Sequence, residues 1–280
     1  MNYQQALFNA NKILKKNSIK SHLLDSEILL SHMIKIERDQ LLLNLNRRIE
    51  NIDYKKFIDL ILRRKKGEPI AYIIGFKEFW KNKFLVNSNV LIPRPDSEVI
   101  VEQALKIIPK EASLNILDIG TGSGCIILSI LKERKKCFGI GIDISLKALK
   151  VAKINAKIQQ IKNRIKFVNS DIDKFCLGKY DVVISNPPYI DSFRINYLDN
   201  DIKNYEPKVA LDGGIDGLSC IDVVIKKSSR LIKKKGKLLI EIGSNQFDKT
   251  KKLLNKKNFY INKIVKDLGN NDRCILSTKN

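Results

Sequence analysis

Histidine, paired cysteine and long apolar segments are all scarce in this 280-residue sequence. The two histidines and the five scattered cysteines include no CxxC pair, which argues against a zinc site or a disulfide framework and favours reduced thiols. The longest apolar runs are strand-length, well below the roughly 20 residues of a membrane helix. The N-terminal residues show a helical period without the apolar core of a secretory signal. We therefore expect a cytoplasmic protein with no membrane segment and no metal.

Acidic residues are outnumbered, with 30 of them against 52 lysines and arginines, and the formal net charge is +22. Such an excess is typical of proteins that bind nucleic acid. However, lysine, isoleucine and asparagine are abundant together in every region, as an A+T-rich coding sequence would produce. Composition therefore leaves a nucleic-acid partner and a coding bias as two open explanations.

The chain is long enough for two domains, and its character changes near residue 67. Residues 1–66 contain short segments of helical periodicity, including "YQQALFNANKILKK" and "DYKKFIDLILRRKK". This predicted helical bundle carries no cluster of titratable groups, so we expect it to dock a partner or act as a scaffold. Residues 67–90 are rich in aromatic and β-branched side chains and predict a β-hairpin, with its turn at 81–83, that joins the two domains.

Residues 91–280 alternate between strand-like and helix-like segments. Strands are predicted at 114–120, 137–144, 164–170, 180–186, 236–243, 259–267 and 274–279, and helices at 125–136, 146–161 and 218–235. Such alternation implies a parallel sheet with right-handed crossovers, and the last two strands are open to an antiparallel arrangement. The predicted class is a doubly wound, Rossmann-like α/β domain.

A glycine-rich loop separates the first of these strands from its helix. The stretch "LDIGTGSGC" places Gly120, Thr121, Gly122, Ser123 and Gly124 at this turn, where missing side chains let a ligand approach the backbone. The G-x-G-x-G spacing departs from the dinucleotide fingerprint, and no P-loop lysine follows it. A nucleoside triphosphate is therefore disfavoured, whereas S-adenosylmethionine, which has no phosphate, fits the loop.

Acidic residues end or follow the first three strands of this domain. Asp143 is placed to accept both ribose hydroxyls of an adenosine ligand, and Asp118 precedes the loop where a sulfonium would bind. Asp171 is suited either to the adenine amino group or to capping the next segment, and the sequence leaves both roles open. The glycines, Asp118 and Asp143 together indicate an S-adenosylmethionine site.

The fourth strand ends in "SNPPYI". Proline cannot donate to a sheet ladder, so the strand must end at Asn186, which borders the switch point where doubly wound sheets bind ligands. The Asn186 side-chain oxygen and the Pro187 carbonyl can accept both hydrogens of a planar NH2 group, favouring positive charge on its nitrogen. Pro188 adds rigidity, and Tyr189 is predicted to form an apolar wall for a flat group. The nitrogen that accepts the methyl group loses its proton only after the transfer. No histidine is therefore needed as a general base.

Five motifs lie in one order along the chain: "GEPIAYIIGFKEFW" (67–80), "VLIPRPDSE" (90–98), "LDIGTGSGCI" (117–126), "SNPPYI" (185–190) and "YEPKVALDGGIDGL" (205–218). Over nearly its whole length the chain resembles the HemK/PrmC family of peptide chain release factor glutamine methyltransferases. The resemblance implies a class I enzyme that methylates the glutamine side-chain nitrogen (N5) in the Gly-Gly-Gln loop of bacterial class I release factors. By position, loop 120–124 and Asp143 hold S-adenosylmethionine, residues 186–189 hold the glutamine, and the N-terminal helices contact the release factor.

The family pattern also directs attention to residues near the expected site. Members often carry an aromatic residue after the acidic residue at 171 to pack on adenine, and Ile172 stands there, with Phe175 nearby. Arg94 is expected to pair with a carboxylate, in a structural or a catalytic role. Glu206 and the glycine turn that follows it are expected to line the substrate cleft. Nothing in the sequence requires more than a monomer.

Two other functions compete with glutamine methylation. A nucleic-acid amino-methyltransferase, acting on adenine N6 or a similar nitrogen, would use the same NPPY chemistry but predicts a base-flipping pocket and further recognition domains. A non-enzymatic RNA- or ribosome-binding module would tolerate loss of the glycine loop or the NPPY residues, and all of these are intact. Glutamine methylation of release factors is therefore the favoured hypothesis.

Overall fold

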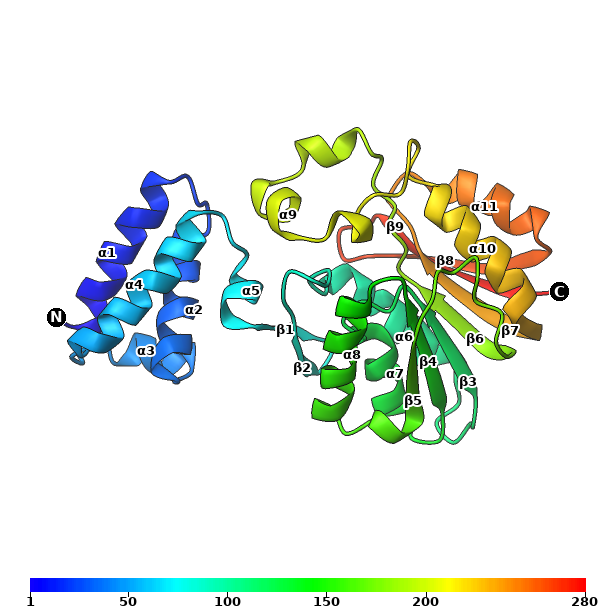
Figure 1. Ribbon diagram of the computed structural model, residues 1–280, viewed down its shortest axis with the longest axis horizontal. Coiled ribbons are helices and arrows are strands. Elements are labelled where there is room, and N and C mark those ends of the chain that lie inside the picture. Colours follow the sequence, from blue (N-terminus) through cyan, green and yellow to red (C-terminus); the bar gives the residue numbers. More distant parts are fainter. The chain divides into compact units, whose positions relative to one another are not determined.

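The computed structural model describes residues 1–280, which form two compact units (Figure 1). The helical unit comprises Met1–Gly75 together with Asp199–Tyr205. The sheet unit comprises Phe76–Leu198 and Glu206–Asn280. The chain therefore passes between the two units three times.

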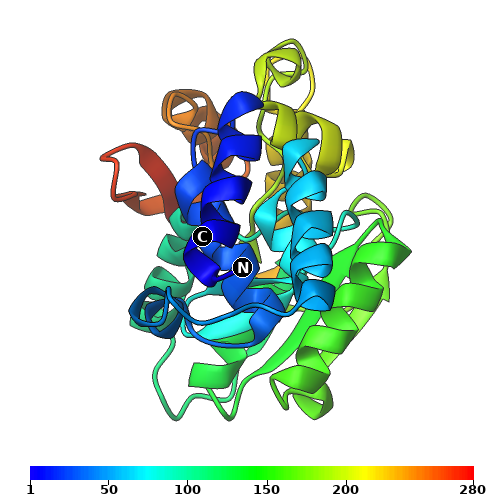
Figure 2. The same cartoon turned by 90° about the vertical axis from the view of Figure 1, so that its left-hand side faces the viewer.

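Apolar side chains at helical spacing fold the first 75 residues into short helices. These are α1 (Tyr3–Lys16), α2 (His22–Ile34), α3 (Arg38–Leu43), α4 (Asn51–Lys65) and α5 (Ile70–Ile74). A capping box between Asn2 and Gln5 satisfies backbone donors at the start of α1. Leu14, Leu29 and Phe57 are fully buried in the core that α1, α2 and α4 share, and Figure 2 shows α1 and α4 side by side.

A distant piece of chain completes the helical unit. Helix α9 (Asn200–Tyr205) lies against the end of α4, where the Asp201 carboxylate is 3.9 Å from the Arg64 guanidinium. The Tyr205 hydroxyl donates a hydrogen bond to the Lys66 carbonyl at 3.0 Å. Arg64 is itself buried and donates to Asp25 of α2 at 2.6 Å. These contacts attach α9 to the helical unit, although the residues on both sides of it belong to the sheet unit.

The hairpin is shorter than the predicted range 67–90. Strands β1 (Phe76–Phe79) and β2 (Asn82–Leu85) pair antiparallel, and their turn lies at residues 80 and 81, not at 81–83. Trp80 has a positive φ of 55°, as two-residue hairpin turns require. Residues 70–74 are helical and not extended, because Pro69 begins a turn and Gly75, with φ of 82°, ends it in the left-handed conformation.

The sheet unit is built on seven strands. They are β3 (Asn115–Ile119), β4 (Phe138–Asp143), β5 (Ile165–Asn169), β6 (Tyr180–Ser185), β7 (Ile232–Glu241), β8 (Phe259–Lys266) and β9 (Asp272–Lys279), in the spatial order β5-β4-β3-β6-β7-β9-β8. Strand β9 alone runs opposite to the other six strands, and it pairs antiparallel with β7 and β8. The chain order reverses between β3 and β6, which is the switch point where doubly wound sheets bind ligands. The doubly wound, Rossmann-like class predicted from the sequence is confirmed.

Helices cover both faces of this sheet (Figure 1). Helices α6 (Glu98–Ile107), α7 (Cys125–Glu133) and α8 (Leu146–Ile158) contribute to the core on one face, and α10 (Ser219–Leu231) and α11 (Phe247–Lys256) to the core on the other. Helix α10 ends four residues before its predicted end at 235, because Ile232 is already buried as the first residue of β7. The lysines that follow give no periodic signal, so the sequence could not locate this boundary. None of the helices combines the length and the apolar character needed to cross a membrane.

Candidate active site

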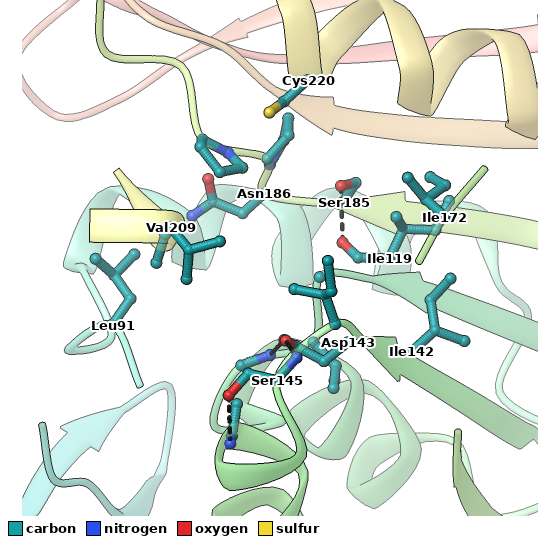
Figure 3. A pocket seen from close by; sticks show the side chains of 18 of the residues that line it. Leu91, Ile119, Ile142, Asp143, Ser145, Ile172, Ser185, Asn186, Val209 and Cys220 are labelled. Atoms are coloured by element: carbon teal, nitrogen blue, oxygen red, sulfur yellow. Dashed lines mark hydrogen bonds between the residues drawn. The ribbon is translucent and has the colours of Figure 1, made fainter. Parts of the chain in front are cut away.

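A cavity of about 410 Å3 opens at the carboxyl ends of β3, β4 and β6. Figure 3 shows Asp143 and Ile142 at one end of it, and Asn186, Leu91 and Val209 at the other. We call these the Asp143 end and the Asn186 end. The volume lies within the range of small-molecule sites, roughly 300–1,000 Å3.

Gly120 and Gly122 give the Asp143 end its open wall. Both have positive φ, 73° and 54°, and a Cβ on either would meet no atom within 4 Å. Because both glycines line the cavity, their missing side chains leave room for a ligand directly against the backbone. Gly124 has a different role, since a Cβ there would meet Leu128 at 3.0 Å and the residue does not line the cavity. It allows the loop to pack on α7.

Asp143 fixes the conformation of this loop. Its Oδ2 accepts the Gly122 N–H at 2.9 Å, and its Oδ1 accepts the Ser145 N–H at 2.9 Å. Burial raises the pKa of Asp143, whereas the Ser145 and Gly122 N–H groups lower it. A carboxylate has about four lone-pair positions, so two remain for a ligand in the cavity that Asp143 lines.

Thr121 and Ser123 also line the cavity, and hydrogen bonds to residues outside the cavity fix each of them. The Thr121 hydroxyl donates to Asp118 at 2.7 Å. The Ser123 carbonyl accepts from Asn155 of α8 at 2.8 Å, and the same fully buried asparagine exchanges hydrogen bonds with both backbone groups of Leu85. The hairpin and the glycine loop are therefore tied to one side chain.

Asp118 supports the loop and does not line the cavity. It is buried, and burial raises its pKa to about 7, against a lowering by the Thr121 hydrogen bond. Asp118 was predicted to lie beside a sulfonium, and in the structure its carboxylate instead accepts the hydrogen bond of the Thr121 hydroxyl. This difference arises because the side chain of Asp118 turns back under the loop to meet the hydroxyl three residues later.

Asp171 and Ile172 line the cavity after β5. The Asp171 Oδ1 accepts the Asp173 N–H at 2.9 Å, so the capping role that the sequence allowed is present. Phe175, the suggested substitute for an adenine-packing aromatic residue, is buried in the core under the sheet and does not line the cavity. Ile172 is the side chain at this position that a ligand can contact.

Asn186, Pro187 and Pro188 line the opposite end. The Asn186 Nδ2 donates to the Ser97 hydroxyl oxygen at 2.9 Å. Neither the Asn186 Oδ1 nor the Pro187 carbonyl accepts a hydrogen bond from within the chain. Two acceptors from adjacent residues are thus free at the mouth of the switch point.

Tyr189 does not line the cavity. Its hydroxyl donates to the Glu241 Oε1 at 3.2 Å and accepts from the Arg273 Nη1 at 3.2 Å. The sequence analysis expected Tyr189 as an apolar wall, and in this structure Leu91 and Val209 supply the apolar surface at the Asn186 end. The Tyr189 side chain points away from the cavity because its hydroxyl bonds to two charged residues, Glu241 on β7 and Arg273 on β9.

A glycine turn packs against the backbone of the NPPY segment. The Gly213 N–H donates to the Ile190 carbonyl at 2.8 Å, and a Cβ on Gly213 would come within 2.8 Å of the Tyr189 Cα. Gly217 has a φ of 71°, and a Cβ there would overlap the Tyr189 carbonyl. The turn that the sequence analysis assigned to the cleft wall therefore supports residues 188–190 by close backbone contact.

Arg94 and Glu206 join two more of the family motifs. The Arg94 Nη2 donates to the Glu206 Oε1 at 2.5 Å, and the Ile92 N–H donates to the other carboxylate oxygen at 3.2 Å. Arg94 lines the cavity, whereas the Glu206 side chain is almost fully buried. The carboxylate partner expected for Arg94 is thus present, and the ion pair fixes the segment before α6.

Ser97 and Glu241 were missed by the sequence analysis. Ser97 is buried beside Asn186, and Glu241 is buried at the carboxyl end of β7, next to β6. A serine in a loop gives no signal. Glu241 did give a signal, since an acidic residue in the apolar run "KLLIEIG" is expected to be buried, and buried acidic residues are rare unless they are paired.

Comparisons with known proteins agree over both units. The PrmC N-terminal domain matches residues 5–75, and a methyltransferase domain matches residues 110–277. The release factor glutamine methyltransferase of Fusobacterium nucleatum is 39% identical over 279 residues, covering 98% of this chain and 78% of that protein. The protein of the same name from Clostridium acetobutylicum is 37% identical and covers 100% of this chain and 99% of its own.

Longer and more distant relatives add to these matches. A bifunctional methyltransferase of Rickettsia prowazekii is 36% identical over 97% of this chain, which spans only 56% of that protein. Among solved structures, a methyltransferase from Pyrococcus furiosus has a TM-score of 0.54 at 18% identity, covering 80% of this chain and 98% of its own, and supports the fold alone.

The sheet order, the cavity at its switch point and the matching domain define a Rossmann-like, class I methyltransferase. Within that class, the identity to curated relatives over nearly the full length is decisive. The chain belongs to the release factor glutamine methyltransferase family.

Proposed function

We propose that this protein transfers a methyl group from S-adenosylmethionine to the side-chain amide nitrogen (N5) of the glutamine in the Gly-Gly-Gln motif of bacterial class I release factors. One observation carries the proposal. The free acceptors of Asn186 and Pro187 border the same cavity as the open backbone of Gly120 and Gly122. The names of the relatives supply the substrate class.

The residues at the Asp143 end suit S-adenosylmethionine. The space left by Gly120 and Gly122 admits a ligand against the backbone, and Asp143 retains acceptor capacity for ribose hydroxyls. Ile142 and Ile172 provide apolar contacts for a flat base, and no basic phosphate-binding side chain follows the loop. When bound, this cofactor supplies a methyl group carried on positively charged sulfur.

The Asn186 end suits a primary amide. An amide nitrogen is a weak nucleophile because its lone pair is delocalised into the carbonyl. The Asn186 Oδ1 and the Pro187 carbonyl can each accept one of its hydrogens, and both bonds strengthen as positive charge develops on the nitrogen. The nitrogen becomes acidic only after it gains the methyl group, so its proton can pass to water. The two histidines lie on α2 and are not needed for this step.

The helical unit is the proposed docking surface for the release factor. It exposes large apolar side chains, with Phe8, Leu43 and Ile52 between 65% and 85% exposed. A protein partner would bury such surface. We extend the proposal to a monomeric enzyme that acts in the cytoplasm, where release factors work.

The test is methyl transfer from labelled S-adenosylmethionine, offered in parallel to a bacterial release factor, ribosomal RNA and duplex DNA. Mass spectrometry would map the modified peptide. We expect label only on the Gly-Gly-Gln glutamine, none on a release factor whose glutamine is replaced by alanine, and a loss of roughly 10²-fold in kcat for Asn186→Ala. Label on a different release factor residue would reject the proposed site.

A nucleic-acid amino-methyltransferase is the second candidate, favoured only by the net charge of +22. The relatives named for release factor glutamine methylation argue against it. Label on RNA or DNA in the parallel assay, with the release factor unmodified, would establish this candidate instead.

A further inference from the structure

The direction of the Asn186 amide is essential to the proposed function and is not fixed by its nearest neighbour. An asparagine side chain has one acceptor oxygen and one NH2 donor, and only the oxygen can receive the N–H of a substrate amide. The Asn186 Nδ2 lies 2.9 Å from the Ser97 hydroxyl oxygen. A hydroxyl can accept or donate, so Ser97 alone would tolerate the amide in either direction.

Glu241 supplies the missing constraint. This carboxylate is 1% exposed, and its Oε1 accepts from the Tyr189 hydroxyl at 3.2 Å. Its Oε2 is buried and accepts no hydrogen bond of normal geometry, although the Ser97 hydroxyl is close enough to favour the ionised form. A buried carboxylate oxygen without a donor is costly, and Ser97 has the one uncommitted proton beside it.

We propose that Glu241 is a positioning residue for methyl transfer: its carboxylate accepts a hydrogen bond from the Ser97 hydroxyl, so that the Ser97 oxygen can only accept from the Asn186 Nδ2 and the Asn186 Oδ1 is left for the substrate amide. This inference rests on the proposed function. The same carboxylate holds the Tyr189 hydroxyl. Glu241 therefore anchors both ends of the Asn186–Tyr189 segment, one through Ser97 and one directly.

Protonation of Glu241 would release this constraint. Burial raises the pKa of Glu241 to about 7, and Ser97, Arg273 and Tyr189 lower it. The other titratable groups that interact with the carboxylate are Asp96 before α6, Cys125 at the start of α7 and Cys274 on β9. A protonated Glu241 can donate to Ser97, which then turns its own proton towards Asn186 and favours the reversed amide. The orientation in which the Asn186 Oδ1 faces the substrate is thus favoured above the pKa of Glu241. It is lost as the pH falls below that pKa.

The experiment compares kcat, KM and pH profile in the full-length enzyme with a release factor as substrate. Glu241→Gln keeps the size of the side chain but can present an NH2 group to Ser97, as the protonated acid does. We expect its kcat to fall at least about tenfold at about pH 8, with the KM for the release factor and the affinity for S-adenosylmethionine nearly unchanged. The decline of kcat below about pH 7 that we expect in the wild type should be absent.

Two further variants separate the relay from a general structural role. Ser97→Ala should lower kcat similarly, and the double variant with Glu241→Gln should be no worse than Ser97→Ala alone, because both changes interrupt one chain of hydrogen bonds. Tyr189→Phe removes only the second branch. It should keep the decline of kcat at low pH, with the decline shifted to higher pH because the Tyr189 hydroxyl lowers the pKa of Glu241.

The outcomes distinguish the two proposals. A wild-type enzyme that leaves release factors unmodified would reject the proposed function itself. A wild type that methylates the glutamine, with Glu241→Gln matching its kcat and pH profile, would overturn only the role of Glu241. Additive losses in the double variant would also overturn it, since independent effects cannot come from one relay.

Discussion

Asp143 combines two tasks in one carboxylate, since it orients the glycine loop and keeps acceptor capacity for a ligand. The Gly122 and Ser145 N–H groups occupy one lone pair on each oxygen. Asp171 is also an acidic residue that follows a strand, but its Oδ1 accepts a hydrogen bond from the Asp173 N–H. The two residues therefore make a matched pair for testing which acidic residue holds the cofactor.

Asp143→Ala should weaken binding of S-adenosylmethionine by about tenfold or more, because charge-assisted hydrogen bonds contribute about 1.5–3 kcal/mol each. Asp171→Ala should weaken it less, since capping is its visible role. Titration calorimetry measures both. Equal losses would bring Asp171 into the cofactor site, and an unchanged affinity for Asp143→Ala would remove Asp143 from it.

Asp118 makes the stability of the sheet unit depend on pH. Burial holds its pKa at about 7 in the folded chain, above the ordinary value of 3.8. Folding therefore favours the protonated acid, so the stabilisation is complete below about pH 4 and is lost as the pH rises through 7. Asp118→Asn cannot titrate, so its free energy of unfolding relative to the wild type should increase between about pH 5 and pH 8.

Urea unfolding followed by the fluorescence of Trp80, the single tryptophan of the chain, reports on the sheet unit that contains it. Asp248→Asn, on the exposed surface of α11, is the control and should show no such trend. If Asp118→Asn and Asp248→Asn changed in parallel with pH, Asp118 would not be the group responsible.

The sequence predicts the position of some side chains of the site and not of others. Most of the residues that it selected for the cavity, Gly120, Asp143 and Asn186 among them, do line it, because strand ends and turns fix where a backbone goes, whereas Gly124 does not. Tyr189 was expected in the cavity and does not line it in this structure, since its hydroxyl bonds to Glu241 and Arg273, far away in the sequence. Partners that meet only after folding leave no local pattern.

At the level of elements, the NPPY segment depends on the glycine turn at 213–217. Both Gly213 and Gly217 bring their backbone so close to residues 188–190 that a Cβ would displace them. The proline pair is rigid internally, but its position in space is set by this second segment. The turn thus positions the NPPY segment, although Gly213 and Gly217 do not themselves line the cavity.

Gly217→Ala should lower kcat by about tenfold or more, because it moves the backbone next to the Asn186 acceptor and loss of a positioned hydrogen bond has effects of this order. Gly178→Ala is the matched control. Its φ of 79° is as unfavourable for alanine, but its Cβ would meet only the Tyr180 side chain, away from the cavity. We expect both to lose stability by about 1 kcal/mol or more and only Gly217→Ala to lose activity out of proportion. Equal activity losses would show that strain alone is responsible.

Most elements could be predicted because their signals are local. The alternation of apolar segments located all seven strands of the large sheet, and "NPPY" predicted the end of β6 to within one residue, at Asn186 instead of Ser185. Helix α5 was mistaken for extended chain, since five apolar residues are too few to show a helical period. The start of β7 was missed for a related reason: the lysines after Ile232 carry no alternation, and they lie in a register shift between the pairs Tyr180–Ile232 and Val182–Lys237.

On the scale of the whole molecule, residues 199–205 are the least predictable feature. They belong to the helical unit by their contacts, yet they lie in the chain between the NPPY segment and the glycine turn. No sequence pattern marks them, because Arg64 and Lys66, which hold them, lie more than a hundred residues earlier. Their stability should therefore follow that of the first 75 residues.

Phe57→Ala tests this dependence. Phe57 is fully buried in the helical unit, and its loss should cost about 3–5 kcal/mol there. Hydrogen exchange measured by mass spectrometry should then quicken in residues 199–205 together with α1, α2 and α4. Ile225→Ala, a cavity in the core of the sheet unit, should leave the rate in 199–205 unchanged. If exchange in residues 199–205 quickened in Ile225→Ala and stayed unchanged in Phe57→Ala, α9 would belong to the sheet unit.

The interleaved path of the chain has a consequence for engineering. A graft that exchanged only residues 1–75 for those of a relative would leave α9 behind without its own partners at Arg64 and Lys66. Residues 1–75 and 199–205 must therefore be exchanged together if the helical unit is to keep its own contacts. The helical unit is therefore not a single continuous segment, and a chimera joined only after Gly75 would combine the first 75 residues of one protein with the α9 of another.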